Sequence, residues 1–189
     1  MNKYTTIFKN WFAYAAIITL LCGIIYVTVL QSFRLQANDP QVEMVQDAAL
    51  NINKGADPKI ITGTGPAMDI SQNLSPYLVV YDPAGNVVSG SATLNGKPLK
   101  IPQGVIDYIR KNGRDAASWK PAPGVRQAMV GVSTAKKDYI VIAGRSLRPT
   151  EERIDRLGEL VLLGWAMSLL GMFVVAVLQE WITRRQPQV

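Results

Sequence analysis

The sequence contains no histidine and only one cysteine, and this composition excludes several kinds of chemistry. Without histidine the chain lacks the commonest general base, the usual zinc ligand and any histidine that accepts a phosphoryl group. The one cysteine, Cys22, lies in a long apolar segment, so the remainder of the chain has neither a disulfide nor a reactive thiol. We therefore expect no metal site, no cofactor and no enzymatic activity.

One catalytic alternative and one binding alternative are left to weigh. Ser133 with Lys136 or Lys137 would suit a Ser/Lys hydrolase if burial lowered the lysine pKa, but two adjacent lysines beside Asp138 are more typical of a solvated turn. The glycines do not follow a phosphate-binding spacing. The formal net charge is +6, but the charges between the apolar segments are of mixed sign and form no basic stripe. We therefore expect no nucleic-acid partner.

Two uncharged apolar runs dominate the ends of the chain, residues 11–30 and residues 160–178. About 20 residues of helix cross a hydrocarbon core of roughly 30 Å, so both runs predict membrane spans. Lys3 and Lys9 before the first run are also compatible with a cleaved signal peptide. That run is longer than a usual signal core and lacks a small-x-small cleavage site, which favours an uncleaved anchor.

The charges beside the first span predict the orientation. Lys3 and Lys9 precede it and Arg34 follows it, which favours a cytoplasmic N-terminus. We expect a two-pass protein of a bacterial inner membrane with both termini cytoplasmic and the domain extracytoplasmic. The expected boundaries are an N-terminal segment 1–10, transmembrane helix 11–32, domain 33–158, transmembrane helix 159–181 and tail 182–189.

A helix is predicted directly after the first span, because apolar residues recur there at helical spacing until Gly55 ends the pattern. Asn38, Asp39 and Pro40 either cap and begin this helix or interrupt a longer one that rises from the membrane. Residues 59–76 are rich in Gly, Pro, Ser, Thr and Asn, which indicates a loop. The apolar residues of the helix are Val42, Val45, Ala49 and Ile52.

The rest of the domain reads as α+β. A β-hairpin begins at Tyr77 and turns at residues 82–86, a short helix follows Gly104 and ends at Gly113, and Ser146 caps a last helix that runs unbroken into the second span. The connections between the last strands are too short for parallel crossovers. We expect a five-stranded, mostly antiparallel sheet with flanking helices, as in PAS-like or Cache-like domains. Those last strands are residues 115–120, 125–133 and 139–144.

Several segments resemble the extracytoplasmic sensor region of bacterial membrane-bound histidine kinases. They include the start at Ala37 to Gln41, the stretch from Trp119 to Arg126 and the end at Ala143 to Leu147. The resemblance implies a sensor domain, a small-molecule ligand and a two-component signalling context. It does not extend to the kinase, because Trp181 is followed only by ITRRQPQV. A partner histidine kinase or another transmitter is therefore expected.

A ligand pocket in such a domain would lie between the sheet and the segments that cover it. Trp119 can stack on a ligand and Arg126 can bind a carboxylate through its planar donors. Their structural alternatives are core packing for Trp119 and an ion pair with Asp115 or Asp82 for Arg126, while Arg145 would stabilise a carboxylate or strand-end carbonyls. The candidate ligand-binding residues are Tyr81, Trp119, Arg126 and Arg145.

Two functions follow from these observations. The first is a signal-input protein whose membrane helices pass a change in the domain to a partner. The second is a binding or scaffold module that docks an envelope protein without signalling.

Small residues in the second span allow close helix approach, either in a homodimer or by packing on the first span through Gly23. They are Gly164, Ser168 and Gly171.

Overall fold

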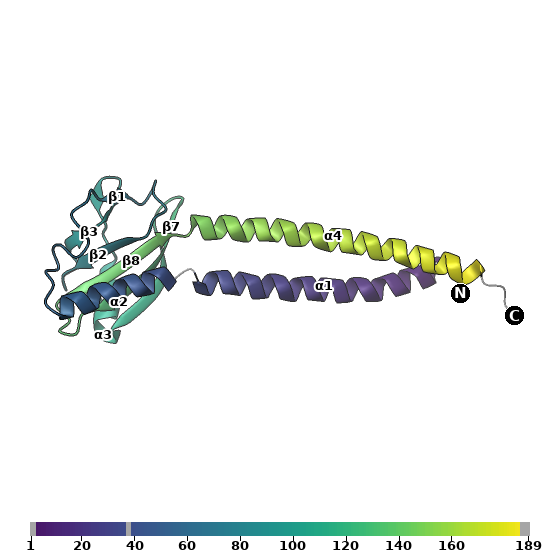
Figure 1. Ribbon diagram of the computed structural model, residues 1–189, viewed down its shortest axis with the longest axis horizontal. Coiled ribbons are helices and arrows are strands. Elements are labelled where there is room, and N and C mark those ends of the chain that lie inside the picture. Colours follow the sequence, from purple (N-terminus) through teal and green to yellow (C-terminus); the bar gives the residue numbers. More distant parts are fainter. Residues whose placement is uncertain (1–2, 37–38, 186–189) are drawn as a thin grey trace. The chain divides into compact units, whose positions relative to one another are not determined.

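The computed structural model describes residues 3–36 and 39–185, which form two compact units. One unit combines the two ends of the chain, Met1–Phe33 and Glu152–Val189, and the other is Arg34–Glu151. Two helices come first along the chain, then a run of strands, a short helix, further strands and a last long helix (Figure 1). They are α1 (Lys3–Gln36), α2 (Asp39–Asn53), β1 (Met68–Asp69), β2 (Tyr77–Tyr81), β3 (Val87–Gly90), β4 (Ala92–Leu94), β5 (Lys97–Pro98), α3 (Gln103–Asn112), β6 (Arg114–Ala122), β7 (Val125–Ser133), β8 (Ile140–Ser146) and α4 (Arg148–Arg185).

Two indole hydrogen bonds join α1 to α4, which lie side by side and antiparallel (Figure 1). Trp11 Nε1 donates to the carbonyl of Leu169 at 3.0 Å, and Trp165 Nε1 donates to Thr19 Oγ1 at 2.9 Å. Both helices are long and apolar enough to cross a membrane. Their outer faces expose large apolar side chains, among them Leu20, Ile24, Leu163, Met167 and Leu170.

Gly164 and Gly171 of α4 do not pack closely on α1. A Cβ atom placed on Gly164 or Gly171 would have no neighbour within 4 Å, and the same is true of Gly23. The Ser168 hydroxyl donates to the Gly164 carbonyl within its own helix, at 2.7 Å. Of the two arrangements considered for these residues, packing on the first span through Gly23 is therefore not seen for Gly164 and Gly171.

The main sheet of the domain has five antiparallel strands in the order β3-β2-β8-β7-β6. A second sheet of three strands has the order β1-β4-β5, and β1 pairs with β4 in parallel. The expected α+β class with an antiparallel sheet and flanking helices is confirmed. The second sheet was not expected: Met68 and Asp69, placed by sequence in a loop, form its first strand because the main chain of Ser91 and Thr93 supplies hydrogen-bond partners.

The β2–β3 turn is held by one carboxylate. Asp82 accepts hydrogen bonds from the Asn86 backbone at 2.8 Å and from the Asn86 side chain at 2.9 Å. These bonds, the side-chain one first, hold the pKa of Asp82 below its ordinary value, because they favour the charged form. The turn also places Gly85 at a φ of 83°, a conformation open to glycine. The hairpin expected from Asp82 to Asn86 is thus explained by local chemistry.

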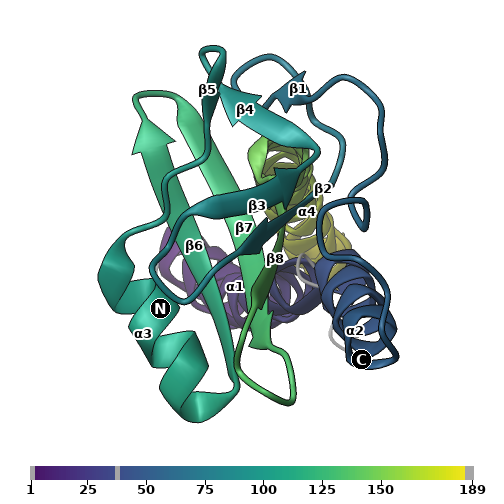
Figure 2. The ribbon, with the colours of Figure 1, turned by 90° about the vertical axis from the view of Figure 1, so that its left-hand side faces the viewer.

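The sheet buries apolar residues on both faces, so its strands contribute to two cores. Figure 2 shows α3 and α2 on either side of the sheet, and on the α3 face Ile106 and Ile109 belong to one cluster with β8 residues Ile140 and Ile142. On the opposite face Val45, Ala48 and Ala49 of α2 pack in a second cluster with β8 residues Val141 and Ala143. Successive strand residues point to opposite faces, so a doubly covered strand reads as a continuous apolar run.

The helices at the two ends of the domain, α2 and α4, begin as follows. α2 begins at Asp39, with Pro40 in its first turn, while the Asn38 cap expected from sequence lies outside the described residues. α4 begins at Arg148, whose backbone N–H donates to the Ser146 hydroxyl at 3.3 Å. From there α4 continues unbroken to Arg185, as the sequence predicted.

Candidate functional site

One end of the main sheet gathers polar side chains on its α3 face. In the register of the sheet, Tyr77 pairs with Gly144, and Gln127 lies between Ser146 and Trp119. Tyr77, Gln127 and Trp119 therefore belong to neighbouring rows at the end where β8 leads into α4. We call these three residues the polar corner.

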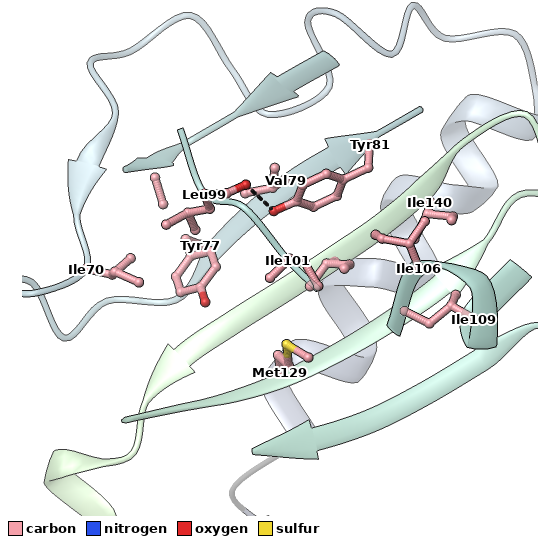
Figure 3. Close-up of a cluster of buried hydrophobic side chains, with 12 residues drawn as sticks. Ile70, Tyr77, Val79, Tyr81, Leu99, Ile101, Ile106, Ile109, Met129 and Ile140 are labelled. Atoms are coloured by element: carbon pink, nitrogen blue, oxygen red, sulfur yellow. Dashed lines mark hydrogen bonds between the residues drawn. The ribbon is translucent and has the colours of Figure 1, made fainter. Parts of the chain in front are cut away.

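Tyr77 is 2% exposed, and its hydroxyl has no hydrogen-bond partner among the described residues. Its ring lies directly over Gly144, where a Cβ would clash with the phenol carbon and oxygen. Figure 3 shows the hydroxyl pointing away from the Leu99 carbonyl. Burial raises the pKa of Tyr77, so the group stays protonated and keeps its proton to donate.

Gln127 is the second buried donor of the polar corner. The side chain is 1% exposed, and its Nε2 has no hydrogen-bond partner within the described part of the chain. A buried donor without a partner costs about 1–3 kcal/mol. An acceptor that reached either donor would satisfy it, and an anionic oxygen is the strongest kind of acceptor.

A groove adjoins the polar corner at Trp119. Its volume is about 570 Å³, and its walls come from the β4–β5 hairpin and the β6 strand. Two lysines stand on its rim and no acidic residue lines it. The nearby Asp69 carboxylate is engaged by Ser71, first through its side chain and then through its backbone, which lowers the Asp69 pKa. The lining residues are Leu94, Asn95, Lys97, Pro98, Lys100, Trp119 and Pro121.

The four residues that the sequence singled out occupy different environments. Tyr81 is fully buried in the α3-face core, where its hydroxyl donates to the Leu99 carbonyl at 3.1 Å (Figure 3). Trp119 is half-buried, packs against the same core and lines the groove. Both therefore lie on the α3 face, but the Tyr81 hydroxyl is already engaged.

The two arginines lie elsewhere. Arg126 is exposed and pairs with Glu151 at 3.0 Å, in place of the Asp115 or Asp82 partner expected from sequence. Arg126 does not pair with Asp115 or Asp82, because its position in β7 brings the side chain to Glu151 in the first turn of α4. Arg145 precedes the α3-face residue Ser146 and follows Gly144, so strand alternation directs it to the α2 face. Neither arginine belongs to the polar corner, and their role in ligand binding stays a prediction.

Sequence reasoning did not single out Tyr77 or Gln127. Tyr77 begins the apolar run YLVVY, where it reads as an ordinary core residue. Gln127 carried a weak signal, because an amide at the start of the run AMV in a buried strand needs a partner. That both lack one became visible only when the register placed them in adjacent rows.

No family model matches this chain, and no curated protein matches it. Among solved structures, it is similar to a Cache chemosensory domain described for carboxylic acid recognition, at 15% identity and a TM-score of 0.42, over 62% of this chain and 97% of that one. A methyl-accepting chemotaxis protein from Vibrio parahaemolyticus gives 15% identity and a TM-score of 0.42, over 66% and 98%. The periplasmic sensor domain of a chemotaxis protein gives 14% and 0.32, over 71% and 96%. At these values the likeness assigns neither a family nor a ligand to this chain.

Proposed function

We propose that this chain is a membrane-anchored signal-input protein without catalytic activity of its own. Its domain, residues 34–151, binds a small carboxylate at the polar corner as a Cache-like sensor domain. The long helices α1 and α4 cross a bacterial inner membrane, with the domain outside and both termini in the cytoplasm. A partner transmitter, such as a histidine kinase, receives the signal.

The observation that carries this proposal is the pair of buried, unpartnered donors on Tyr77 and Gln127. They lie where strand β8 ends, and only Leu147 separates β8 from α4. The first turn of α4 is tied to β7 twice: the Leu147 N–H donates to the Arg126 carbonyl at 2.9 Å, and Arg126 pairs with Glu151. A shift of β7 or β8 upon ligand binding would therefore be transmitted directly to the start of α4.

A ligand moves this device only by binding one arrangement better than another. Satisfying two buried donors supplies such a difference, because each donor is costly while it lacks a partner. Lys97 and Lys100 add a positive field at the rim of the groove, which favours an anion and raises its rate of entry. Trp119 offers an aromatic wall for the apolar part of the ligand.

The membrane assignment rests on the helix pair itself. The outer faces of α1 and α4 are apolar, and the polar groups between them, such as the Trp165 indole and the Thr19 hydroxyl, bond to each other. Internal pairing of polar groups is what a bilayer requires. Reporter fusions at Val189 and near Gly96 test the orientation, and an outward-facing C-terminus would contradict it.

The ligand assignment is tested by thermal unfolding of the full chain in detergent, with sodium salts of short carboxylic acids and matched neutral amides. A carboxylate at about a hundred times its Kd stabilises the folded state by about 2.7 kcal/mol, and hence raises Tm by several degrees. Tyr77→Phe and Gln127→Leu should lose this shift. Gln46→Leu makes the same change on the exposed side of α2 and should retain it.

Two results would contradict the proposal. In one, no carboxylate stabilises the wild-type chain, while a specific envelope protein cross-links to the domain in cells, as a scaffold would require. In the other, a carboxylate stabilises Tyr77→Phe and Gln127→Leu as much as the wild type, which would place its site away from the polar corner.

A further inference from the structure

Helix α2 carries a third buried amide on the opposite face of the sheet. Gln41, in the first turn of α2, is 0% exposed, and neither its Oε1 nor its Nε2 has a hydrogen-bond partner among the described residues. An unpartnered amide in an apolar interior is costly, because it loses its bonds to water and gains none in exchange. The first turn of α2 is therefore held in an unfavourable environment.

The rest of α2 is anchored firmly. Val45, Ala48 and Ala49 pack into the α2-face core. At the C-terminal end, the Asn53 side-chain oxygen accepts a hydrogen bond from the Ala135 backbone N–H at 2.9 Å, in the β7–β8 turn. The apolar contacts hold the helix on the sheet, while Gln41 opposes docking at one end only.

This arrangement fixes where Gln41 lies along the sheet. The twelve residues from Asn53 back to Gln41 span about 18 Å at a helical rise of about 1.5 Å per residue. At about 3.3 Å per strand residue, that distance equals five to six residues from the β7–β8 turn. Gln41 therefore lies several strand residues away from the β7–β8 turn, toward the end of the sheet where β8 leads into α4.

The buried atoms without partners thus gather at one end of the sheet. Ala128 follows Gln127 in β7, and Arg145 follows Gly144, the residue under the Tyr77 ring. Strands β7 and β8 therefore present the polar corner on one face and the first turn of α2 on the other. The same end is where α4 begins and where the chain enters α2.

We propose that the first turn of α2 is a two-position element controlled by Gln41, an inference that rests on the proposed sensor function. In the docked position the Gln41 amide is buried and unpartnered. In the second position the turn lifts from the sheet and the amide is solvated. Ligand binding at the polar corner shifts β7 and β8 and changes the balance between the two positions.

Hydrogen exchange of the full chain in lipid nanodiscs, resolved by mass spectrometry, measures how often the first turn of α2 opens. Gln41→Leu removes the side-chain amide and keeps the side-chain volume. In this variant the backbone N–H groups of residues 42–46 should exchange about tenfold more slowly than in the wild type, since 1.4 kcal/mol corresponds to a factor of ten. Gln41→Glu should exchange faster, because a buried carboxylate costs more than a buried amide.

Gln46→Leu is the matched control, because it makes the same change at an exposed position of the same helix. It should leave exchange within about twofold of the wild type, since surface substitutions change stability little. Unchanged or faster exchange in Gln41→Leu, or unchanged exchange in Gln41→Glu, would overturn the two-position element.

A second readout separates this inference from the proposed function. The carboxylate that gives the largest Tm shift in the wild type is added, and exchange in α2 should change at least threefold in the wild type and less in Gln41→Leu. If the carboxylate shifts Tm without changing α2 exchange, the coupling is refuted while the sensor function stands. If no carboxylate shifts Tm but exchange responds to Gln41 as expected, the ligand assignment and the coupling fail, and the two-position helix stands.

Discussion

Two tyrosines on one strand offer a test in which the same chemical change has opposite effects. Tyr77 and Tyr81 are both buried, and each loses only its hydroxyl on substitution by phenylalanine. The Tyr77 hydroxyl has no partner, whereas the Tyr81 hydroxyl donates to the Leu99 carbonyl. We expect Tyr77→Phe to stabilise the ligand-free domain and Tyr81→Phe to destabilise it.

The magnitudes follow from the partners. Removing the unpartnered hydroxyl of Tyr77 relieves a desolvation cost of about 1–3 kcal/mol. Removing the Tyr81 hydroxyl loses a hydrogen bond with a net value of about 0.5–1.5 kcal/mol and leaves the Leu99 carbonyl unpaired, which adds a cost of similar size. The two variants should therefore differ in free energy of unfolding by about 2–6 kcal/mol, the sum of these effects.

Hydrogen exchange in β2 and β8 of the full chain measures this difference without reference to the membrane helices. Each 1.4 kcal/mol corresponds to a tenfold change in the exchange rate of the most protected amides. Tyr77→Phe should slow their exchange and Tyr81→Phe should accelerate it. Equal destabilisation by both substitutions would refute the reasoning, because it would mean that the Tyr77 hydroxyl has a stabilising partner.

Three further predictions concern the same structure. Burial raises the pKa of Tyr77 and of Tyr81 above the unfolded value of about 10. The free energy of unfolding should therefore be unaffected below about pH 10 and fall above it by about 1.4 kcal/mol per pH unit for each tyrosine, measurable as a falling urea midpoint. Gly144→Ala should cost about 1–3 kcal/mol in the same unfolding assay, because the new Cβ meets the Tyr77 ring. Trp165→Phe should weaken the α1–α4 pairing by about 0.6 kcal/mol, seen as a lower Tm of the helix pair in detergent, because Thr19 loses its donor.

The elements that local chemistry specifies were predicted well. The strand from Tyr77, the turn at Asp82, the helix end at Gly113 and the helix start near Ser146 each depend on residues within a few positions in the chain. β1 was missed, because a strand of two residues, Met68 and Asp69, has no periodicity and forms only by pairing with β4.

The candidate site was predicted only in part. Trp119 lies at the groove, but the two arginines were selected for their chemistry and not for their direction. Strand alternation then directed Arg145 to the α2 face, and Arg126 found Glu151, 25 residues further along the chain. Direction and partner depend on register and on the packing of distant elements, which a single sequence does not display.

The sequence by itself determined the two apolar helices, the α+β class and the absence of histidine chemistry, because hydrophobic periodicity, turn residues and composition are local properties. The tertiary structure alone decided which polar side chains lack partners. Tyr77, Gln127 and Gln41 look unremarkable in the chain, and burial becomes costly for them only after β2, β7, β8 and α2 pack together. Whether a buried group is satisfied depends on every element around it, so the polar corner and the Gln41 position arise from the fold.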